Sequence, residues 1–278
     1  EPETVLWTDR HGLPGRHTRF LARSENVLWV TTWQGTGLVR GTPDGPIVAT
    51  DSLRPSHTRP CIDASGVLWL ATDDAVLRIR GERTLERFPP TGGFTACAPA
   101  PDGGLWIATE RGLLHASVNG DAPLPVAGIP FGDDARIDAV LHDHAGRLWI
   151  AHAERVCHAN ASTGEPDAWT CDPVPGVGVL SALLEVEPGT IWAATRQAGV
   201  LVRDGDEWRQ LPANATLASH SIFALAPSPH GGVWIAGHGI LQRVRPGGDA
   251  GWQLLETPGK RNGLLSIGGG DLLEDDDG

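Results

Sequence analysis

The sequence lacks several features that would assign it to a class at once. It has no Tyr and no Met among 278 residues, and its 22 Lys and Arg residues are outnumbered by 34 Asp and Glu residues, giving a net charge of −12. No apolar run approaches the roughly eighteen residues that a membrane-spanning helix needs. A nucleic-acid-binding face needs clustered basic residues. We therefore expect no nucleic acid partner and no membrane contact within this segment.

The start of the chain also lacks an initiator Met and an apolar signal region, which indicates a mature or excised segment. What the chain has in excess is tryptophan, with eleven Trp against five Phe, in a turn-rich composition of 36 Gly and 22 Pro. Six Trp recur in similar segments such as Gly103-Gly-Leu-Trp106-Ile-Ala-Thr109, and they are Trp29, Trp69, Trp106, Trp149, Trp192 and Trp234. Their spacings of 40, 37, 43, 43 and 42 residues are typical of four-stranded propeller blades.

Each period predicts four short strands. Residues 138–141 illustrate an apolar first strand, and Gly146 then supplies the positive φ that the next turn requires. The repeated Trp lies on the second strand. A further set of large rings marks the fourth strands: Trp7, Phe88, Trp169, Trp208 and Trp252. We expect these ten Trp to fill the gap between adjacent sheets, which leaves Trp33 without a packing role.

The two ends of the chain predict an incomplete blade. Residues 1–14 have the pattern of a fourth strand and its exit loop, and residues 262–278 that of a first strand and its turn. The sequence therefore predicts one all-β propeller domain over residues 1–278, with six full four-stranded antiparallel repeats and two strands of a seventh. A chain that continues past residue 278 and a ring closed by a reduced last blade both remain open.

The repeat resembles the two-component regulator propeller family. An acidic turn leads into Gly-x-Leu-Trp-Ile-Ala-Thr and then Gly-Leu within residues 102–113, Gly-Leu-Pro follows a predicted fourth strand at residues 12–14, and residues 262–264 are a weaker copy. The resemblance covers essentially the whole chain. It departs from the family at the usual Tyr-Asp after the third strand, which is replaced by pieces such as Val202-Arg-Asp204.

The resemblance implies a function and a location. Repeats of this family form seven-bladed propellers in the periplasmic sensor region of histidine kinases, hybrid two-component systems or diguanylate cyclases, and many recognise oligosaccharides. By this resemblance the chain is a non-catalytic, ligand-sensing propeller on the periplasmic or extracellular face of a bacterial inner-membrane signalling protein. Other domains of the same chain and a homodimer partner are its expected contacts, and a bound small molecule or oligosaccharide would shift their arrangement.

The residues leave two alternative functions open. No nucleophile elbow, phosphate-binding loop or dinucleotide fingerprint is present, so we expect a non-enzyme. Acidic residues are abundant, however, and a carboxylate pair of the kind used by glycosidases is compatible with them. A propeller lyase or glycoside hydrolase is therefore the first alternative, and a protein-interaction scaffold is the second, because a fold does not choose among functions.

Neither a metal nor a cofactor is expected. Four histidines, His142, His144, His152 and His158, fall within seventeen residues. They are divided between opposite ends of a predicted blade, and no Cys/His spacing resembles that of a zinc site.

The four cysteines fall on predicted strands. Cys157 and Cys171 lie on the third and fourth strands of one blade, so we expect a disulfide between them in an oxidising compartment. Cys61 and Cys97 lie on first strands of neighbouring blades, and we expect both to be buried as small apolar groups.

Ligands of propellers commonly meet the face formed by the loops that enter each blade and the loops between second and third strands, and loops are free to vary on a rigid scaffold. Trp33 is the foremost candidate there, since a ring in a polar loop suits stacking on a sugar or filling a junction between domains. The full set of candidate ligand-binding residues is His11, Arg16, His17, Trp33, Gln34, His57, Arg59, Asp73, Asp74, Glu110, Arg111, Arg196, Gln197, His220 and His238.

Overall fold

The computed structural model describes residue 13 and residues 18–25, 27–32, 36–40, 47–50, 59–162, 164–174, 176–246 and 252–256. These residues form 24 strands and one short 3₁₀ helix, Pro212–Thr216. In the same ranges, no helix has both the length and the apolar character needed to cross a membrane.

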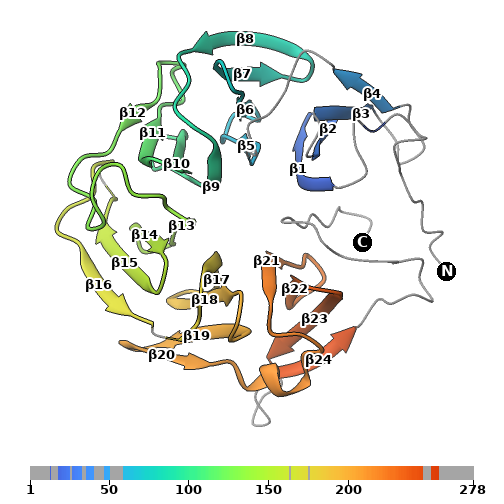
Figure 1. Ribbon diagram of the computed structural model, residues 1–278, viewed down its shortest axis with the longest axis vertical. Helices are drawn as coiled ribbons and strands as arrows, with labels where there is room; N and C mark the ends of the chain where they lie inside the picture. The colour runs from blue at the N-terminus through green and yellow to red at the C-terminus, as the bar shows by residue number, and fades with distance from the viewer. Residues whose placement is uncertain are drawn as a thin grey trace.

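The strands form six four-stranded antiparallel sheets that lie around a common centre (Figure 1). The first three sheets contain β1 (Thr18–Ser24), β2 (Val27–Thr32), β3 (Thr36–Arg40) and β4 (Ile47–Thr50); β5 (Cys61–Ile62), β6 (Leu68–Ala71), β7 (Val76–Arg80) and β8 (Arg83–Phe88); and β9 (Phe94–Pro99), β10 (Leu105–Thr109), β11 (Gly112–Ala116) and β12 (Leu124–Pro125).

The last three sheets contain β13 (Ala139–His142), β14 (Arg147–His152), β15 (Arg155–Asn160) and β16 (Thr170–Pro173); β17 (Leu180–Glu187), β18 (Thr190–Thr195), β19 (Val200–Asp204) and β20 (Glu207–Gln210); and β21 (Ile222–Pro227), β22 (Val233–Gly237), β23 (Ile240–Pro246) and β24 (Trp252–Glu256). In every sheet the strands follow one another in chain order, and the first of the four lies nearest the centre (Figure 1).

The structure confirms an all-β fold of four-stranded antiparallel sheets, with the six repeated Trp on the second strands as predicted. One detail differs, because Trp169 directly precedes β16 instead of lying on it. The strands expected within residues 1–14 and 262–278 fall outside the described residues, apart from Leu13, so the seventh blade stays a prediction.

A glycine turn joins the first two strands of the second to sixth repeats in the way that the sequence indicates. Gly146 has a φ of 81° in the turn between β13 and β14, a conformation that side chains with a Cβ rarely adopt. A Cβ at Gly146 would also lie 2.8 Å from the Cβ of Ser162. Both conformation and space therefore require glycine here.

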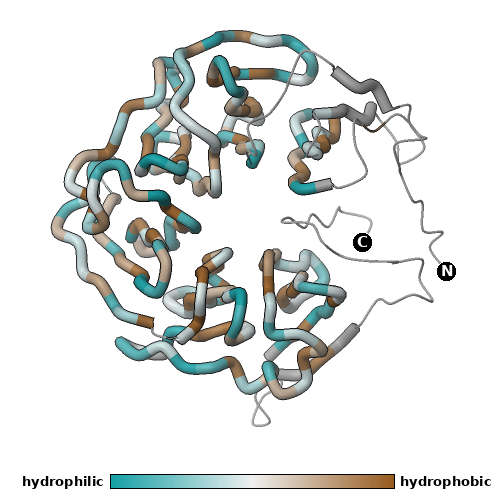
Figure 2. Tube along the Cα trace, in the orientation of Figure 1, coloured by the Kyte–Doolittle hydropathy of each residue, from teal (hydrophilic) through white to brown (hydrophobic). Residues whose placement is uncertain are grey.

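Each buried Trp packs against the sheet that follows its own. Trp29 contacts Leu68 and Leu70 of the second sheet, and Trp192 joins a cluster with Ile222 and Ile235 of the sixth. The first five repeat Trp are all at most 2% exposed. Burying one such ring contributes about 4–6 kcal/mol by area, an upper estimate. In Figure 2, apolar stretches accordingly recur in each of the six sheets.

An aspartate six residues before the Trp satisfies the buried indole N–H in two sheets. The indole of Trp69 donates to Oδ2 of Asp63 at 3.0 Å, and that of Trp149 donates to Oδ2 of Asp143 at 2.8 Å. Arg147 adds a second donor to the same oxygen of Asp143, from Nε at 2.7 Å. Asp63 and Asp143 are 4% and 3% exposed, so these carboxylates are held inside the turns.

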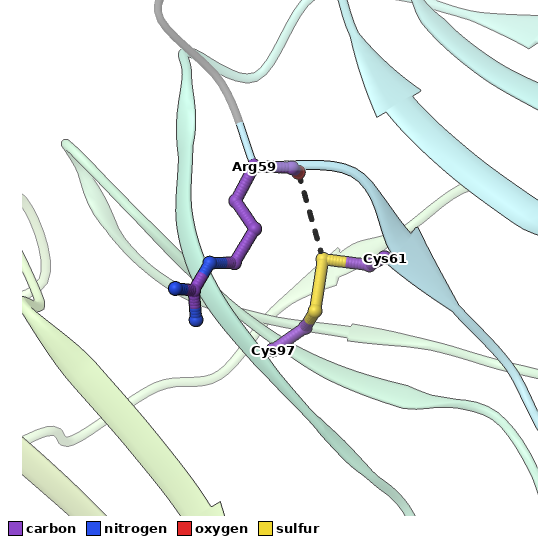
Figure 3. Close-up of a disulfide and its surroundings, with 3 residues drawn as sticks. All are labelled: Arg59, Cys61 and Cys97. Carbon is purple, nitrogen blue, oxygen red and sulfur yellow. Dashed lines mark hydrogen bonds between the residues drawn. A yellow bond between two sulfur atoms is a disulfide. The ribbon is translucent and has the colours of Figure 1, made fainter. Parts of the chain in front are cut away.

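All four cysteines are paired. A disulfide joins Cys157 of β15 to Cys171 of β16, within one sheet, and this is the pair named from the sequence. A second disulfide joins Cys61 of β5 to Cys97 of β9 in the next sheet (Figure 3). The expectation that Cys61 and Cys97 are merely small apolar groups is therefore wrong. Each lies on the first strand of its sheet, and these strands converge at the centre closely enough for a bond between sheets.

We expect Asp143→Ala to lower the free energy of unfolding by about 2–4 kcal/mol at neutral pH, because it leaves the Trp149 N–H and the Arg147 guanidinium without this acceptor. Burial acts to raise the pKa of Asp143, but the bonds from Trp149 and Arg147 outweigh it and hold that pKa below its ordinary value. The stabilisation is thus present above the ordinary carboxyl range and is lost as pH falls through the lowered pKa.

Urea unfolding at several pH values tests this expectation. Asp102→Ala is the matched control, since Asp102 lies in the corresponding turn of the third sheet with its side chain 38% exposed, and we expect a change of about 1 kcal/mol or less. Equal losses in the two variants, or a loss for Asp143→Ala that does not shrink in acid, would contradict the role given to Asp143.

We expect protein purified from an oxidising compartment to show no free thiol when it is denatured and alkylated without reductant, as intact mass would report. Removing the Cys61–Cys97 bridge by a double Ser substitution should lower stability by about 3–4 kcal/mol, since the bridge spans 36 residues, and removing Cys157–Cys171, which spans 14, by about 3 kcal/mol. Detection of four alkylated thiols would show both pairs to be absent.

Candidate functional site

The first strands of the sheets pack on both neighbouring sheets and surround the centre of the assembly (Figure 1), a region that we call the central channel. Residues along β9 and β21 alternate between buried and partly buried, and the partly buried positions include Thr95 and Cys97 on β9 and Phe223 and Leu225 on β21. Because alternate side chains of a strand point to opposite faces, Ala96 packs toward the fourth sheet, whereas Cys97 packs toward the second.

At one end of this channel lies a pocket of about 110 Å³. The pocket is lined by residues from all six sheets or from the segments leading into them: Arg19, Phe20, Arg59, Phe94, Thr95, Arg136, Asp138, Val179, Leu180, Ser181, Arg196 and Phe223. We call this set the channel mouth. It is formed where each chain segment enters its first strand, and by the loop between β18 and β19. The hydrophilic segment that leads into β13 extends toward the centre of the assembly in Figure 2.

Aromatic rings support three of the four arginines at the channel mouth. The guanidinium carbons of Arg19 and Arg59 lie 5.1 and 5.3 Å from the ring centroid of Phe20, and that of Arg196 lies 4.2 Å from the centroid of Phe223. A guanidinium over a ring gains cation–π attraction while its in-plane N–H groups stay available to other partners. The rings therefore help to fix the positions of these arginines.

The fourth arginine is neutralised within the chain. Arg136 contacts Asp138 at 2.8 Å through Nε and Glu110 at 3.2 Å through Nη1. Asp138 also accepts a hydrogen bond from the backbone N–H of Ala153 at 3.1 Å. Arg196, by contrast, forms no ion pair with any residue that the structure describes; its described contacts are the Phe223 ring and a backbone bond to Val179.

Positive charges crowd one another at the channel mouth. Partial burial lowers the pKa of Arg196, and the charge of Arg19 lowers it further. Partial burial likewise lowers the pKa of Arg19, and Arg136 adds to that effect while Glu110 opposes it. Arginine stays protonated at neutral pH even so. The arrangement thus holds cations where solvent screens them poorly, which favours an anion in the pocket.

The structure brings together only part of the predicted binding set. Arg59 and Arg196 line the channel mouth, and Glu110 reaches it through its ion pair with Arg136. The other described candidates do not line the pocket: Asp73, Asp74, Arg111, Gln197, His220 and His238. Trp33, Gln34, His11, Arg16, His17 and His57 lie outside the described residues.

Several of the remaining candidates have structural contacts of their own. Asp74 accepts hydrogen bonds from Thr72 and Arg87. The Gln197 side chain lies against Gly178, in the segment that leads into β17. His220 contacts the backbone oxygen of Asn214 at 3.2 Å.

Sequence reasoning missed ten residues of the mouth: Arg19, Phe20, Phe94, Thr95, Arg136, Asp138, Val179, Leu180, Ser181 and Phe223. The signal shared by three of the arginines is position, because Arg19, Arg59 and Arg136 all stand at or just before the start of a predicted first strand. Aligning the starts of the first strands across the six repeats would have found these arginines. Inspecting the loops of one repeat at a time does not reveal them.

The four clustered histidines are not assembled into a site. His144 contacts Glu185 of the next sheet at 2.6 Å, His152 packs on Phe131 with ring centroids 5.1 Å apart, and His158 packs on Trp149 with centroids 4.4 Å apart. Over the ranges that the structure describes, no group of three or more His, Cys, Asp or Glu residues is placed to hold a metal ion.

A larger pocket of about 480 Å³ lies between the fifth sheet and the end of the fourth, and is lined by Asp172, Asp206, Glu207 and Trp208 among others. Two of its carboxylates are already engaged, since Arg203 contacts Asp172 at 3.4 Å and Asp206 at 3.1 Å. This pocket draws on two sheets only. The channel mouth, to which all six contribute, is the better candidate site.

Comparison with known proteins adds to the fold. No family model matches the chain, and no curated protein matches it. Among solved structures it is similar to the extracellular domain of a putative hybrid two-component system from B. thetaiotaomicron, with a TM-score of 0.73, 14% identity, and coverage of 94% of this chain and 37% of that one. The chain thus spans little more than a third of the length of that extracellular domain.

Two further likenesses are of different kinds. The extracellular domain of another putative hybrid two-component system from B. thetaiotaomicron has a TM-score of 0.56 and 15% identity, with 87% of this chain and 43% of that one covered. Virginiamycin B lyase from Staphylococcus aureus has a TM-score of 0.64 and 12% identity, with 86% and 84% covered. At such identities, sensor domains and an enzyme alike show the fold alone, which is all-β and propeller-like.

We expect Cys97 to act as a chemical probe of the channel. After gentle reduction, Cys97 should react with iodoacetamide several-fold faster than Cys61, because Cys97 is partly exposed while Cys61 is 1% exposed. Peptide mass mapping after short pulses of reagent measures the two rates. Equal rates, or faster reaction at Cys61, would show that the relative exposure of the two thiols has been assigned wrongly.

Proposed function

We propose that this chain is the ligand-sensing, non-catalytic propeller of an extracytoplasmic bacterial signalling protein, and that its ligand binds at the channel mouth. The observation that supports the proposal best is that one pocket collects residues from all six described sheets. A ligand held there contacts segments that are far apart in the chain, so its binding energy can favour one relative arrangement of the sheets over another.

The cysteines support the extracytoplasmic part of the proposal. All four are in disulfides, and such bonds persist in oxidising compartments and are rare in the cytosol. The resemblance of the repeats to two-component regulator propellers and the fold shared with two extracellular sensor domains point the same way. An oligosaccharide is the ligand class that the sequence resemblance suggests, and other domains of the same protein would receive the signal.

A lyase is the second candidate, favoured by the mutual coverage of 86% and 84% with virginiamycin B lyase. The described lining of the channel mouth contains no histidine and no free thiol, and its carboxylate, Asp138, pairs with Arg136 and lies 4.0 Å from Nδ1 of His152. Asp138 is therefore engaged by other side chains of this protein, and the arginines around it suit the holding of an anion. For these reasons we favour binding over catalysis.

We expect at least one member of a panel of neutral and acidic oligosaccharides to bind with a Kd between micromolar and millimolar by isothermal titration calorimetry. Val179→Trp should weaken that binding at least tenfold, because Val179 lines the channel mouth with 46% of its surface exposed and a larger ring would fill the pocket. Leu124→Trp is the matched control, since Leu124 is 65% exposed on β12, away from this pocket, and should leave binding unchanged.

Binding that survives Val179→Trp would place the ligand elsewhere, and a panel without any binder would favour the interaction scaffold. Incubation with quinupristin, followed by liquid chromatography, addresses the lyase. We expect an unchanged substrate peak, and time-dependent loss of that peak would overturn the non-catalytic proposal.

A further inference from the structure

The chemistry of the channel mouth limits what the ligand can be. Four guanidinium groups line it, and two described carboxylates, Asp138 and Glu110, lie nearby; both contact Arg136, and the charge of Glu110 also acts on Arg19. This concentration of positive charge occurs in a chain whose net charge is −12. A protein with this net charge is expected to attract cations over most of its surface. The arginines of the channel mouth are expected to attract anions instead.

The geometry of Arg196 suits the capture of an anion. Its guanidinium is stacked on Phe223 at 4.2 Å and has no carboxylate partner among the described residues. Stacking restricts the rotamers of a long side chain before any ligand arrives, so less conformational entropy is lost on binding. The edge of the planar group keeps paired N–H donors that match the oxygens of a carboxylate, sulfate or phosphate.

The size of the pocket matches one such group. Its volume of about 110 Å³ gives room for an oxyanionic group. The rest of a larger ligand would lie outside the pocket, across the loops of the same face.

We propose that the channel mouth binds one oxyanionic group of the ligand, a carboxylate, sulfate or phosphate, with Arg196 as its principal donor and Arg19 beside it. The inference rests on the proposed function for the place of the ligand, and it adds the chemical class. Partial burial lowers the pKa of Arg196 and repulsion from Arg19 lowers it further, and a bound anion relieves that repulsion. Binding and local stability are therefore coupled.

Four probes that differ in one substituent test the proposal: D-glucuronate, glucose 6-sulfate, glucose 6-phosphate and glucose. Calorimetric titration at constant ionic strength should detect the three charged probes in the millimolar range and no binding of glucose. Their order of affinity distinguishes a carboxylate ligand from a sulfated or phosphorylated one. Raising the salt concentration should weaken all three, because the contact is electrostatic and partly exposed to solvent.

Arg196→Gln should weaken the charged probes by ten- to a hundredfold, and Arg196→Lys, which keeps the charge but loses the planar fork, should have a smaller effect. Arg83→Gln is the control for net charge, since Arg83 is exposed on β8 and does not line the pocket. Circular dichroism and melting temperature establish that each variant folds. If Arg196→Gln is unfolded, Arg196→Lys replaces it as the test: weaker binding of the charged probes supports the proposal, and unchanged binding contradicts it.

The outcomes separate this inference from the proposed function. Charged probes that bind no better than glucose, or equally well to Arg196→Gln, overturn the inference, while an oligosaccharide that still binds and is blocked by Val179→Trp leaves the sensing function intact. Charged probes that bind through Arg196 when no oligosaccharide binds support the anion site and count against sugar sensing.

Discussion

The structure depends on one repeated interaction, the burial of a second-strand Trp against the next sheet. The ring is large enough to fill the space between two twisted sheets that diverge from the centre, and its burial supplies several kcal/mol at each junction. Trp29 and Trp192 show the two ends of this series, each packed on the sheet that follows. Trp234 is partly exposed, and it lies on the last of the described sheets.

Burying the Trp ring also buries its indole N–H, and the sheets differ in whether they provide an acceptor for it. Asp63 and Asp143 accept the indole N–H in the second and fourth sheets. Six residues before the Trp, the aspartate is replaced by Arg23 in the first repeat and by Ala100 in the third. The indole N–H groups of Trp29 and Trp106 have no acceptor among the described residues. A buried unsatisfied donor costs about 1–3 kcal/mol. Repeats of one architecture therefore differ in how much their polar groups contribute, although their apolar packing is alike.

The repeat architecture could be predicted from the sequence because it rests on local signals. Trp149 with the turn glycine Gly146 marks a second strand within a few residues, and the same pattern recurs six times. The pairing of Cys157 with Cys171 was accessible for the same reason, since β15 and β16 are neighbours in the chain. These features need only short-range geometry.

The channel mouth could not be assembled in that way, because its residues meet only when the sheets are arranged around the centre. Arg19 and Arg196 are distant in the chain, and nothing within either repeat indicates that they line one pocket. Cys61 and Cys97 were misjudged for the same reason. Two first strands of adjacent sheets are brought side by side by the curvature of the whole assembly.

The bond between Cys61 and Cys97 has a mechanical consequence for the assembly. It is a covalent cross-link between the second and third sheets, and it lies two residues from Arg59, whose carbonyl oxygen is 3.7 Å from Cys61 Sγ (Figure 3). The junction between the fifth and sixth sheets is held at the same depth by a hydrogen bond, from Ser181 Oγ to the oxygen of Ile222 at 2.8 Å. The second and third sheets are therefore joined covalently at their first strands, with Arg59 beside the bond, whereas the fifth and sixth sheets are joined there by a hydrogen bond that can open.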